Sequence, residues 1–304
     1  MKRREFVTIS SGTLLALAVN PRSLGASLPS ETAWWREARK FAELPFSRVA
    51  YVERGEGPAA LFIHGWSLNG YQWRGALERL HRQRRCLAPD MMSMGWTETL
   101  AEQEISPTTQ AIMLGQLLDQ LRIDAVDLVA NDSGGLTAQL FLAKYPARVR
   151  TLLLTNCDVD ENSPPPQFLP FIEKARQGTL VDEFVVPQAD DKARARSAAG
   201  VGAFYTHPER LSDETIETYF RPFATSKLKR TQLNQFSVAM ATNPLVAIRE
   251  DLRHWKGAAR MVWGLNDPLF GVKWPSGWTG RCPVRVASDE SRQRTSSSPR
   301  KCPT

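Results

Sequence analysis

The stretch Ala125-Val126-Asp127-Leu128-Val129-Ala130-Asn131-Asp132-Ser133-Gly134-Gly135 decides the fold. Its first half is an apolar run typical of a buried strand, and its second half is a turn of small residues before a helical pattern. The tightest strand-to-helix turns exclude bulky side chains two residues before and two residues after the central residue. Ala130 and Gly134 meet this requirement when Asp132 is central. The spacing therefore predicts a tight turn that presents the Asp132 side chain at the end of a strand.

A carboxylate at the centre of such a turn can act as a nucleophile. It attacks carbon in a substitution or ring-opening step and leaves an alkyl-enzyme ester, which water then cleaves. Ser133 is a second candidate for the centre, but its flanking positions, Asn131 and Gly135, satisfy the steric rule less well. An Asp that only caps the following helix would also fit the pattern. We predict that Asp132 is a catalytic nucleophile.

Strand-like and helix-like segments alternate on both sides of this turn. Apolar runs typical of strands occupy residues 59–63, 85–90, 125–130, 151–155 and 259–264, and helical patterns occupy residues 108–121 and 136–144. This alternation predicts an α/β protein with a mostly parallel sheet and helices on both faces. Residues 159–245 break the rhythm with three prolines at 164–166 followed by charged helical segments. We therefore expect a core of residues 45–158 and 246–270, with residues 159–245 forming an inserted helical cap.

Several motifs together resemble the branch of the α/β-hydrolases that uses an Asp nucleophile, which includes haloalkane dehalogenases, epoxide hydrolases and fluoroacetate dehalogenases. The motifs are Phe62-Ile63-His64-Gly65-Trp66, Ala88-Pro89-Asp90 with Gly95, the turn at Asp132, Tyr145-Pro146-Ala147-Arg148-Val149 and Val262-Trp263-Gly264-Leu265-Asn266-Asp267. The resemblance covers roughly residues 45–275. It implies an α/β-hydrolase fold that acts on a small-molecule substrate and needs neither a cofactor nor a metal.

The resemblance also assigns roles to single residues. The backbone N–H groups of Trp66 and Ser133 would form an oxyanion hole, which stabilises negative charge on the reacting oxygen. Asp267 would be the acid that orients a catalytic histidine, although an Asp before a proline is also a common turn residue. Asp158 and Glu161 compete for this acid role, because some dehalogenases place the acid after the preceding strand.

One departure from the dehalogenase pattern, together with two tyrosines of the cap, leaves the substrate open. A carbon–halogen bond is the first prediction, but Ser133 stands where those enzymes place a tryptophan that holds the halide. Trp66 could supply an indole N–H instead, or it could simply pack. Epoxide hydrolases use two tyrosines of the cap to protonate the opening ring, and Tyr205 and Tyr219 lie in the predicted cap. Epoxides and esters are therefore the alternative substrates.

The general base expected after the last strand is missing from the sequence. The chain has four histidines, His64, His81, His207 and His254, and none follows Asp267. His64 belongs to the oxyanion motif, and we predict that His64 and Asn156 line the substrate pocket. The resemblance therefore predicts a hydrolase that is impaired by loss of its histidine, with a non-catalytic, degraded or binding-only relative as the alternative.

The last segment, residues 271–304, is unlike the core. It contains no Leu, Ile, Phe, Met, Tyr or His and is rich in Arg, Ser and Pro, without strand or helix periodicity. We predict a disordered basic tail and the loss of the family's last strand and helix. A reading of the message in another frame from Trp274 permits a string that resembles the family's ending. We therefore expect a frameshift near Trp274, with a genuine tail as the alternative.

The first segment, residues 1–26, has the pattern of an export signal. Lys2, Arg3 and Arg4 precede a short uncharged stretch that ends in small residues. The paired arginines resemble the twin-arginine signal, whose receptor reads the pair. The protein is therefore predicted to be exported, as a periplasmic or secreted protein.

Charge and cysteine content exclude other classes of protein. The net charge of +7 comes mostly from the two end segments, so the nearly neutral body implies no nucleic-acid-binding face. After residue 26 the sequence has no apolar run long enough to cross a membrane, so no membrane span is predicted in the mature chain. The four cysteines have no C-x-x-C spacing, which argues against zinc, and Cys86 and Cys157 are predicted to be buried thiols. The sequence leaves the oligomeric state open.

Overall fold

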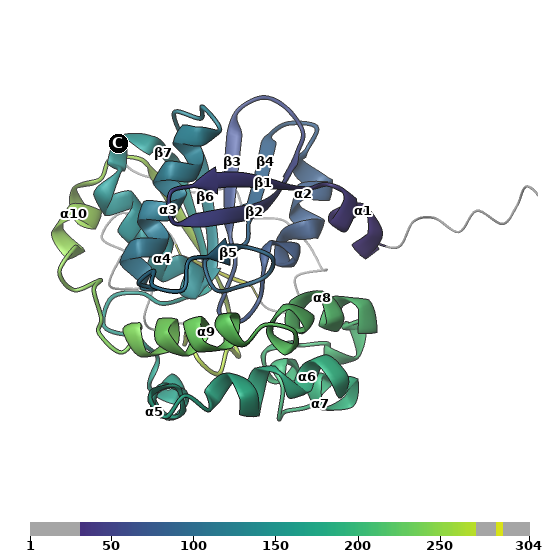
Figure 1. Cartoon of the computed structure of the whole chain (residues 1–304). Coiled ribbons are helices and arrows are strands. Elements are labelled where there is room, and N and C mark those ends of the chain that lie inside the picture. Colours follow the sequence, from purple (N-terminus) through teal and green to yellow (C-terminus); the bar gives the residue numbers. More distant parts are fainter. Residues whose placement is uncertain (1–30, 272–283, 288–304) are drawn as a thin grey trace, which may run out of the picture.

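A mostly parallel sheet organises the computed structural model, which describes residues 31–271 and 284–287 (Figure 1). The predicted export signal lies outside the described residues, as does most of the predicted tail. The strands are β1 (Arg39–Leu44), β2 (Ser47–Arg54), β3 (Ala59–Ile63), β4 (Arg85–Pro89), β5 (Glu98–Thr99), β6 (Val126–Asp132), β7 (Val149–Cys157), β8 (Ala258–Gly264) and β9 (Val284–Ala287). They lie in the order β1-β2-β4-β3-β6-β7-β8-β9, with β5 paired to β2.

Hydrophobic burial explains the parallel half of the sheet. From β4 through β9 all neighbouring strands pair in parallel, and all five residues of β3 are buried. Continuous apolar strands are expected where helices cover both faces of a sheet. Strands β1, β2 and β5, which pair antiparallel, were not predicted. The reason is that their sequences mix charged and apolar residues and resemble loops.

Helices connect the strands of the core and pack against them. They are α1 (Glu31–Glu37), α2 (Arg74–Leu80), α3 (Pro107–Gln120), α4 (Ser133–Lys144) and α10 (Arg249–His254). Helix α4 starts directly at the predicted turn and contacts β6, β7 and α3. Ten of its twelve residues are buried, so the element that carries the turn is fixed in the middle of the core. No helix in the described part of the chain is both long and apolar enough to cross a membrane.

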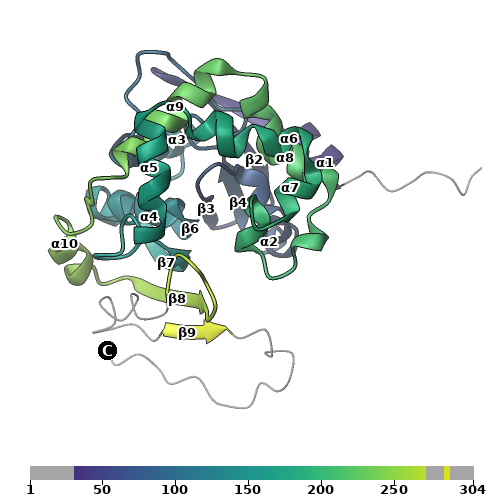
Figure 2. The same ribbon diagram turned by 90° about the horizontal axis from the view of Figure 1, so that it is seen from below.

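A helical cap covers one end of the sheet; it lies below the sheet in Figure 1, and in Figure 2, which is seen from below, its helices lie around β3, β4 and β6. Its helices are α5 (Leu169–Arg176), α6 (Pro187–Asp190), α7 (Lys192–Arg196), α8 (Asp213–Ala224) and α9 (Lys227–Ala239), with a π-helical turn at Val181–Val185. These elements fall within the predicted insertion at 159–245. The cap is therefore built from a single insertion between β7 and β8.

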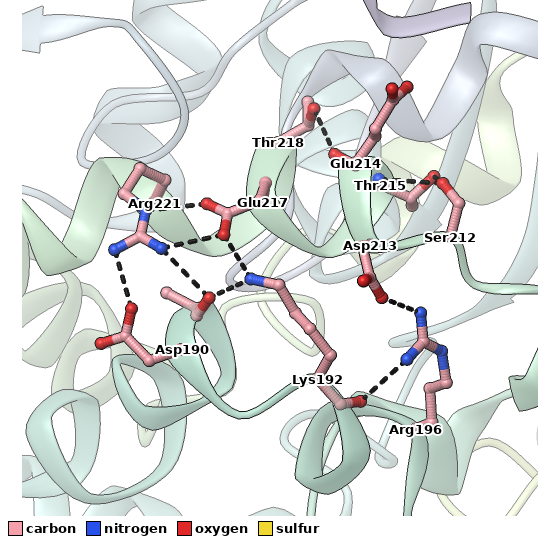
Figure 3. Close-up of polar contacts among 11 residues, drawn as sticks. Asp190, Lys192, Arg196, Ser212, Asp213, Glu214, Thr215, Glu217, Thr218 and Arg221 are labelled. Carbon is pink, nitrogen blue, oxygen red and sulfur yellow. Dashed lines mark hydrogen bonds and ion pairs between the residues drawn. The ribbon is translucent and has the colours of Figure 1, made fainter.

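Ion pairs join the short helices α6 and α7 to α8 (Figure 3). Glu217 accepts hydrogen bonds from Arg221 Nε at 2.7 Å and Arg221 Nη2 at 2.9 Å, and it also pairs with Lys192. Arg221 reaches Asp190 at 2.9 Å. The pKa of Glu217 is lowered to about 2, mainly by its hydrogen bonds from Arg221. This cluster ties together three helices that are too short to be stable alone.

The prediction that the last strand is missing is wrong. Strand β9 pairs in parallel with β8 over four residue pairs, from Met261↔Val284 to Gly264↔Ala287. The sequence Val-Arg-Val-Ala alternates apolar and polar residues and contains two β-branched residues, which suits a short strand. The prediction failed because it relied on the absence of large apolar residues from the tail. A strand of four residues that pairs with β8 forms without them. The predicted loss of the last helix falls outside the described residues.

Candidate active site

The turn between β6 and α4 has the strained geometry that the spacing predicts. Asp132 has φ of 56° and ψ of −138°, whereas Ser133 is the first residue of α4. A side chain on Gly134 would place its Cβ 2.5 Å from the His64 carbonyl oxygen, and one on Gly65 would lie 2.6 Å from the Asp132 Cβ. The left-handed region costs an ordinary residue about 1–2 kcal/mol, so the surrounding packing holds Asp132 in this conformation. Asp132 is thus the central residue of the turn.

Two backbone N–H groups hold one oxygen of this carboxylate. Trp66 N and Ser133 N each donate to Asp132 Oδ1 at 2.7 Å. Burial raises the pKa of Asp132, and the two N–H donors oppose the rise by stabilising the charged form. The predicted oxyanion pair therefore converges on the predicted nucleophile.

His64 and Gln72 support the loop that carries Trp66. His64 is buried, with Nδ1 2.9 Å from the Gly65 carbonyl oxygen, and its Nε2 accepts from Met91 N at 2.9 Å. Burial lowers the pKa of His64, so the ring is neutral. Gln72 Oε1 accepts from Gly65 N at 3.0 Å. His64 was predicted to line the substrate pocket, but it lies behind the loop and shapes it.

Asp267 and Asn156 form a second polar cluster at the end of β8. Asn156 Nδ2 donates to Asp267 Oδ2 at 2.7 Å, and Asn156 Oδ1 accepts from Gly264 N at 3.0 Å. Asp267 Oδ1 accepts from the backbone N–H groups of Leu269 and Phe270, both at 2.8 Å. Both carboxylate oxygens of Asp267 and the amide of Asn156 are thus used to fold the turn after β8. Neither residue lines the cavity between the cap and the sheet.

A cavity of about 350 Å³ lies between the cap and the ends of the strands. Its floor includes Asp132, Ser133 and Asp158. Much of its wall is aromatic and comes from both the core and the cap: Trp66, Phe168, Phe171, Phe184, Phe204, Phe270, Tyr205 and Tyr219. The rings of Phe168, Phe171 and Phe184 lie 5.4–6.3 Å from the Trp66 ring. The cavity therefore suits a small, mainly apolar molecule that reaches the carboxylate of Asp132.

Two phenols from the cap face the same cavity. Tyr205 and Tyr219 both line it, and Tyr219 comes from α8. Burial raises the pKa of both phenols, so both are protonated at neutral pH. Arg74, a third lining residue, opposes the rise with its positive charge. Arg74 was not predicted, because it stands at the start of α2 outside every motif.

Asp158 and Glu161, which compete for one role in the sequence, have different surroundings. Glu161 is exposed and lies 3.5 Å from Arg249. Asp158 is only 4% exposed and lines the cavity directly after β7. Burial, and after it the charge of Asp132, raises the pKa of Asp158 well above its ordinary value. Only Asp158 is therefore close enough to the cavity to take part in chemistry.

None of the chain's four histidines, all of which the structure describes, lines the cavity. His64 is used in the oxyanion loop, as described above. His81 follows α2, His207 lies in the cap beside Glu209, and His254 ends α10. The described residues therefore bring no imidazole to Asp132 or Asp267.

The strained turn, the two N–H donors and the capped cavity define the class of α/β hydrolases. The chain belongs to this family, because the family described as "alpha/beta hydrolase fold" matches residues 58–284. It is 40% identical over 103 residues to epoxide hydrolase 2 of Siraitia grosvenorii, covering 33% of this chain and 32% of that protein. It is 27% identical over 128 residues to haloalkane dehalogenase 2 of Mycobacterium tuberculosis, covering 42% of each.

A solved structure extends the similarity of fold to most of the chain. An α/β hydrolase fold protein from Burkholderia ambifaria superposes with a TM-score of 0.70 at 19% identity, covering 82% of this chain and 89% of that one. The chain spans only 37–42% of the length of the first curated relatives that it matches. The fold and the family of this chain are therefore shown.

Proposed function

We propose that this protein opens epoxides through an ester intermediate on Asp132. The observation that carries the proposal is that Asp132 and two protonated tyrosines of the cap line one cavity. Opening a three-membered ring needs a nucleophile on carbon and an acid on oxygen. The core supplies the first and the cap supplies the second.

The hydrogen bonds of Asp132 suit a nucleophilic carboxylate. Both backbone N–H groups donate to Oδ1, which leaves Oδ2 as the attacking oxygen. Oδ1 becomes the carbonyl oxygen of the ester, and it bears the negative charge when water attacks the ester carbon. The N–H groups of Trp66 and Ser133 are then already in place to stabilise that charge.

The phenols suit the leaving oxygen of the ring. Tyr205 and Tyr219 donate hydrogen bonds to the ring oxygen, and one of them transfers its proton as the C–O bond breaks. The nearby charge of Arg74 stabilises the phenolate that forms. An epoxide oxygen needs such an acid, whereas a halide leaves without a proton and gains little from it.

Dehalogenation, the first prediction from the sequence, receives less support from the same geometry. Trp66 is the one tryptophan among the described residues around the cavity. Its indole N–H donates to Ser237 Oγ at 2.9 Å, and Ser237 in turn donates to the Leu233 carbonyl oxygen at 2.7 Å. The indole donor that would hold a halide is thus engaged in packing the cap.

Turnover of an epoxide panel in ¹⁸O-labelled water tests this proposal. Styrene oxide, trans-stilbene oxide and 1,2-epoxyoctane should give diols, and the label should enter the Asp132 carboxylate during a single turnover. Tyr205→Phe and Tyr219→Phe should each slow diol formation about 10-fold or more, and the double variant about 10²- to 10⁴-fold. Tyr145→Phe, which alters a tyrosine outside the cavity, is the matched control.

Other results would contradict the proposal. Release of bromide from 1-bromobutane without any diol from the epoxides would assign the site to carbon–halogen bonds. A label or adduct on Ser133 would mean that the hydroxyl and not the carboxylate is the nucleophile.

A further inference from the structure

The proposed reaction needs a group that takes a proton from the hydrolytic water, and none of the histidines reaches the cavity. We propose that Asp158 carries the mobile proton of the reaction, first as the acid that restores the phenol and then as the base that activates water. This inference rests on the proposed function, because it assumes the ester on Asp132.

Strand register places Asp158 beside Asp132. In the parallel pair β6 and β7, Asp132 lies opposite Cys157, and Asp158 is the next residue. Neighbouring strands are about 4.8 Å apart, so the two carboxyl groups start from adjacent points of the same sheet edge. Both side chains line the same cavity. A water molecule that attacks the Asp132 ester therefore lies within reach of Asp158.

Helix α4 fixes both residues. Its first N–H, that of Ser133, binds the Asp132 side chain at 2.7 Å. Gln139, one turn and a half further along, donates from Nε2 to the Asp158 carbonyl oxygen at 2.7 Å and to the Gly135 carbonyl oxygen at 2.9 Å. Gln139 is fully buried. The spacing of the two carboxyl groups is therefore set by one rigid element.

We assign a single negative charge to the two carboxyl groups together. No ion pair among the described residues includes Asp132 or Asp158, so no cation within pairing distance offsets a second charge. We place the proton on Asp158 before the reaction, because burial and then the charge of Asp132 raise the pKa of Asp158 well above its ordinary value, whereas two backbone N–H groups stabilise the charged form of Asp132. Esterification makes Asp132 neutral and removes the repulsion. The negative charge can then move to Asp158 at the stage when a base is needed.

Protons and bonds balance over the cycle. In the first step Asp132 Oδ2 forms a bond to a ring carbon, the C–O bond of the epoxide breaks, and a phenol protonates the oxygen. Asp158 gives its proton to the phenolate and becomes a carboxylate. In the second step water adds to the ester carbon while its proton passes to Asp158. The bond from that carbon to the alkyl oxygen breaks, and the departing alkoxide takes the proton of the new carboxylic acid. Asp132 ends ionised, Asp158 ends protonated and a diol leaves.

Mass spectrometry of the full 304-residue chain separates the two steps. With the epoxide panel named above, Asp158→Asn should still form a stoichiometric ester on the Asp132 peptide, and this adduct shows that the variant is folded. The ester should persist, and diol formation should fall about 10²- to 10⁴-fold relative to the unchanged chain. Asp158→Glu, which keeps a carboxyl group, should recover part of the rate.

Chemical rescue adds a measurement that a purely structural role would not affect. The ester trapped on Asp158→Ala should be hydrolysed faster when sodium formate is added, and not when sodium chloride is added. Equal diol rates in Asp158→Asn and the unchanged chain, or an ester that persists equally in both, would overturn the inference while leaving the Asp132 nucleophile intact. Absence of both ester and diol from the unchanged chain would overturn the proposed function, and the inference with it.

Discussion

The cap and the floor of the cavity place carboxyl groups in opposite environments. In the cap, Glu217 is bound by Arg221 and Lys192, and this lowers its pKa to about 2 (Figure 3). On the floor of the cavity, Asp132 and Asp158 lie beside each other, neither forms an ion pair with a described residue, and burial raises the pKa of both. The same functional group is thus stabilised as an anion in one region and penalised as an anion in the other.

This difference separates stability from chemistry. Paired carboxylates on the surface of the cap fix short helices at a small gain in free energy. Adjacent buried carboxyl groups reduce stability, and such arrangements occur where a proton must be moved at neutral pH. The cap is therefore expected to tolerate loss of its charges, whereas the floor of the cavity is expected to lose activity while keeping or gaining stability.

The largest effect is expected at Asp132. Asp132→Asn removes the attacking oxygen but keeps an acceptor for the N–H groups of Trp66 and Ser133. Turnover of epoxides should fall by roughly 10⁴-fold or more. The midpoint of thermal unfolding should not fall, because a buried carboxylate is replaced by a neutral amide. A variant that keeps its activity, or that unfolds at a clearly lower temperature, would contradict the contrast between the two regions.

Two glycine substitutions compare the turn with the cap. Gly134→Ala forces a Cβ to within 2.7 Å of two backbone carbonyl oxygens, and we expect a loss of about 1–3 kcal/mol and a fall in turnover of about 10²-fold. Gly178→Ala, after α5, meets no atom within 4 Å but has φ of 78°. It should cost about 1–2 kcal/mol and leave turnover unchanged. Urea unfolding and diol assays on both variants measure the contrast, and equal activity losses would refute it.

The dependence of stability on pH sharpens the comparison at Asp158. Its pKa is raised in the folded state, so its contribution to stability is complete below pH 3.8 and is lost as the pH rises toward the folded value. Asp158→Asn avoids this loss. The variant should match the unchanged chain near pH 3 and exceed its stability by about 1.4 kcal/mol for each pH unit above 3.8, up to the folded pKa. Asp124→Asn, on an exposed residue, controls for net charge.

The smallest effect is expected at Glu217, where the sign is reversed. Because the pKa of Glu217 is lowered, its contribution is present above pH 4.5 and is lost as the pH falls toward about 2. Its side chain is 39% exposed, so Glu217→Gln should cost only about 0.2–1 kcal/mol at pH 7 and nothing near pH 2. Urea titrations at both pH values test this. A loss of diol formation would mean that the cap charges serve the reaction as well.

Much of the core could be predicted from local patterns. The runs at 59–63, 85–90 and 259–264 become β3, β4 and β8, and the helical patterns at 108–121 and 136–144 become α3 and most of α4. Strands β3 and β4 are almost fully buried, so their composition carries the information. Strand β9 and the antiparallel strands escaped prediction, because pairing with a neighbouring strand decides them more than their own composition does.

The candidate site divides in the same way. The turn motif indicated Asp132, because steric limits on a tight turn act within a few residues of the chain. The roles of Trp66 and Ser133 came from the resemblance to the α/β-hydrolases. The positions of His64 and Asn156 behind the cavity wall depend on hydrogen bonds to distant loops, which no local pattern contains.

Hydrophobic periodicity and short-range sterics are present in the sequence, and they predicted the alternation of strands and helices and the tight turn at Asp132. The oxyanion pair of Trp66 and Ser133 was predicted from the resemblance to a family. Only the tertiary structure decided which cap residues meet the nucleophile and which of two neighbouring acids enters the cavity. Tyr205 and Tyr219 are more than 70 positions from Asp132 in the chain, and Asp158 and Glu161 differ by three positions but face different surroundings. Such choices follow from the packing of one insertion over the edge of a sheet, and that packing is a property of the whole fold.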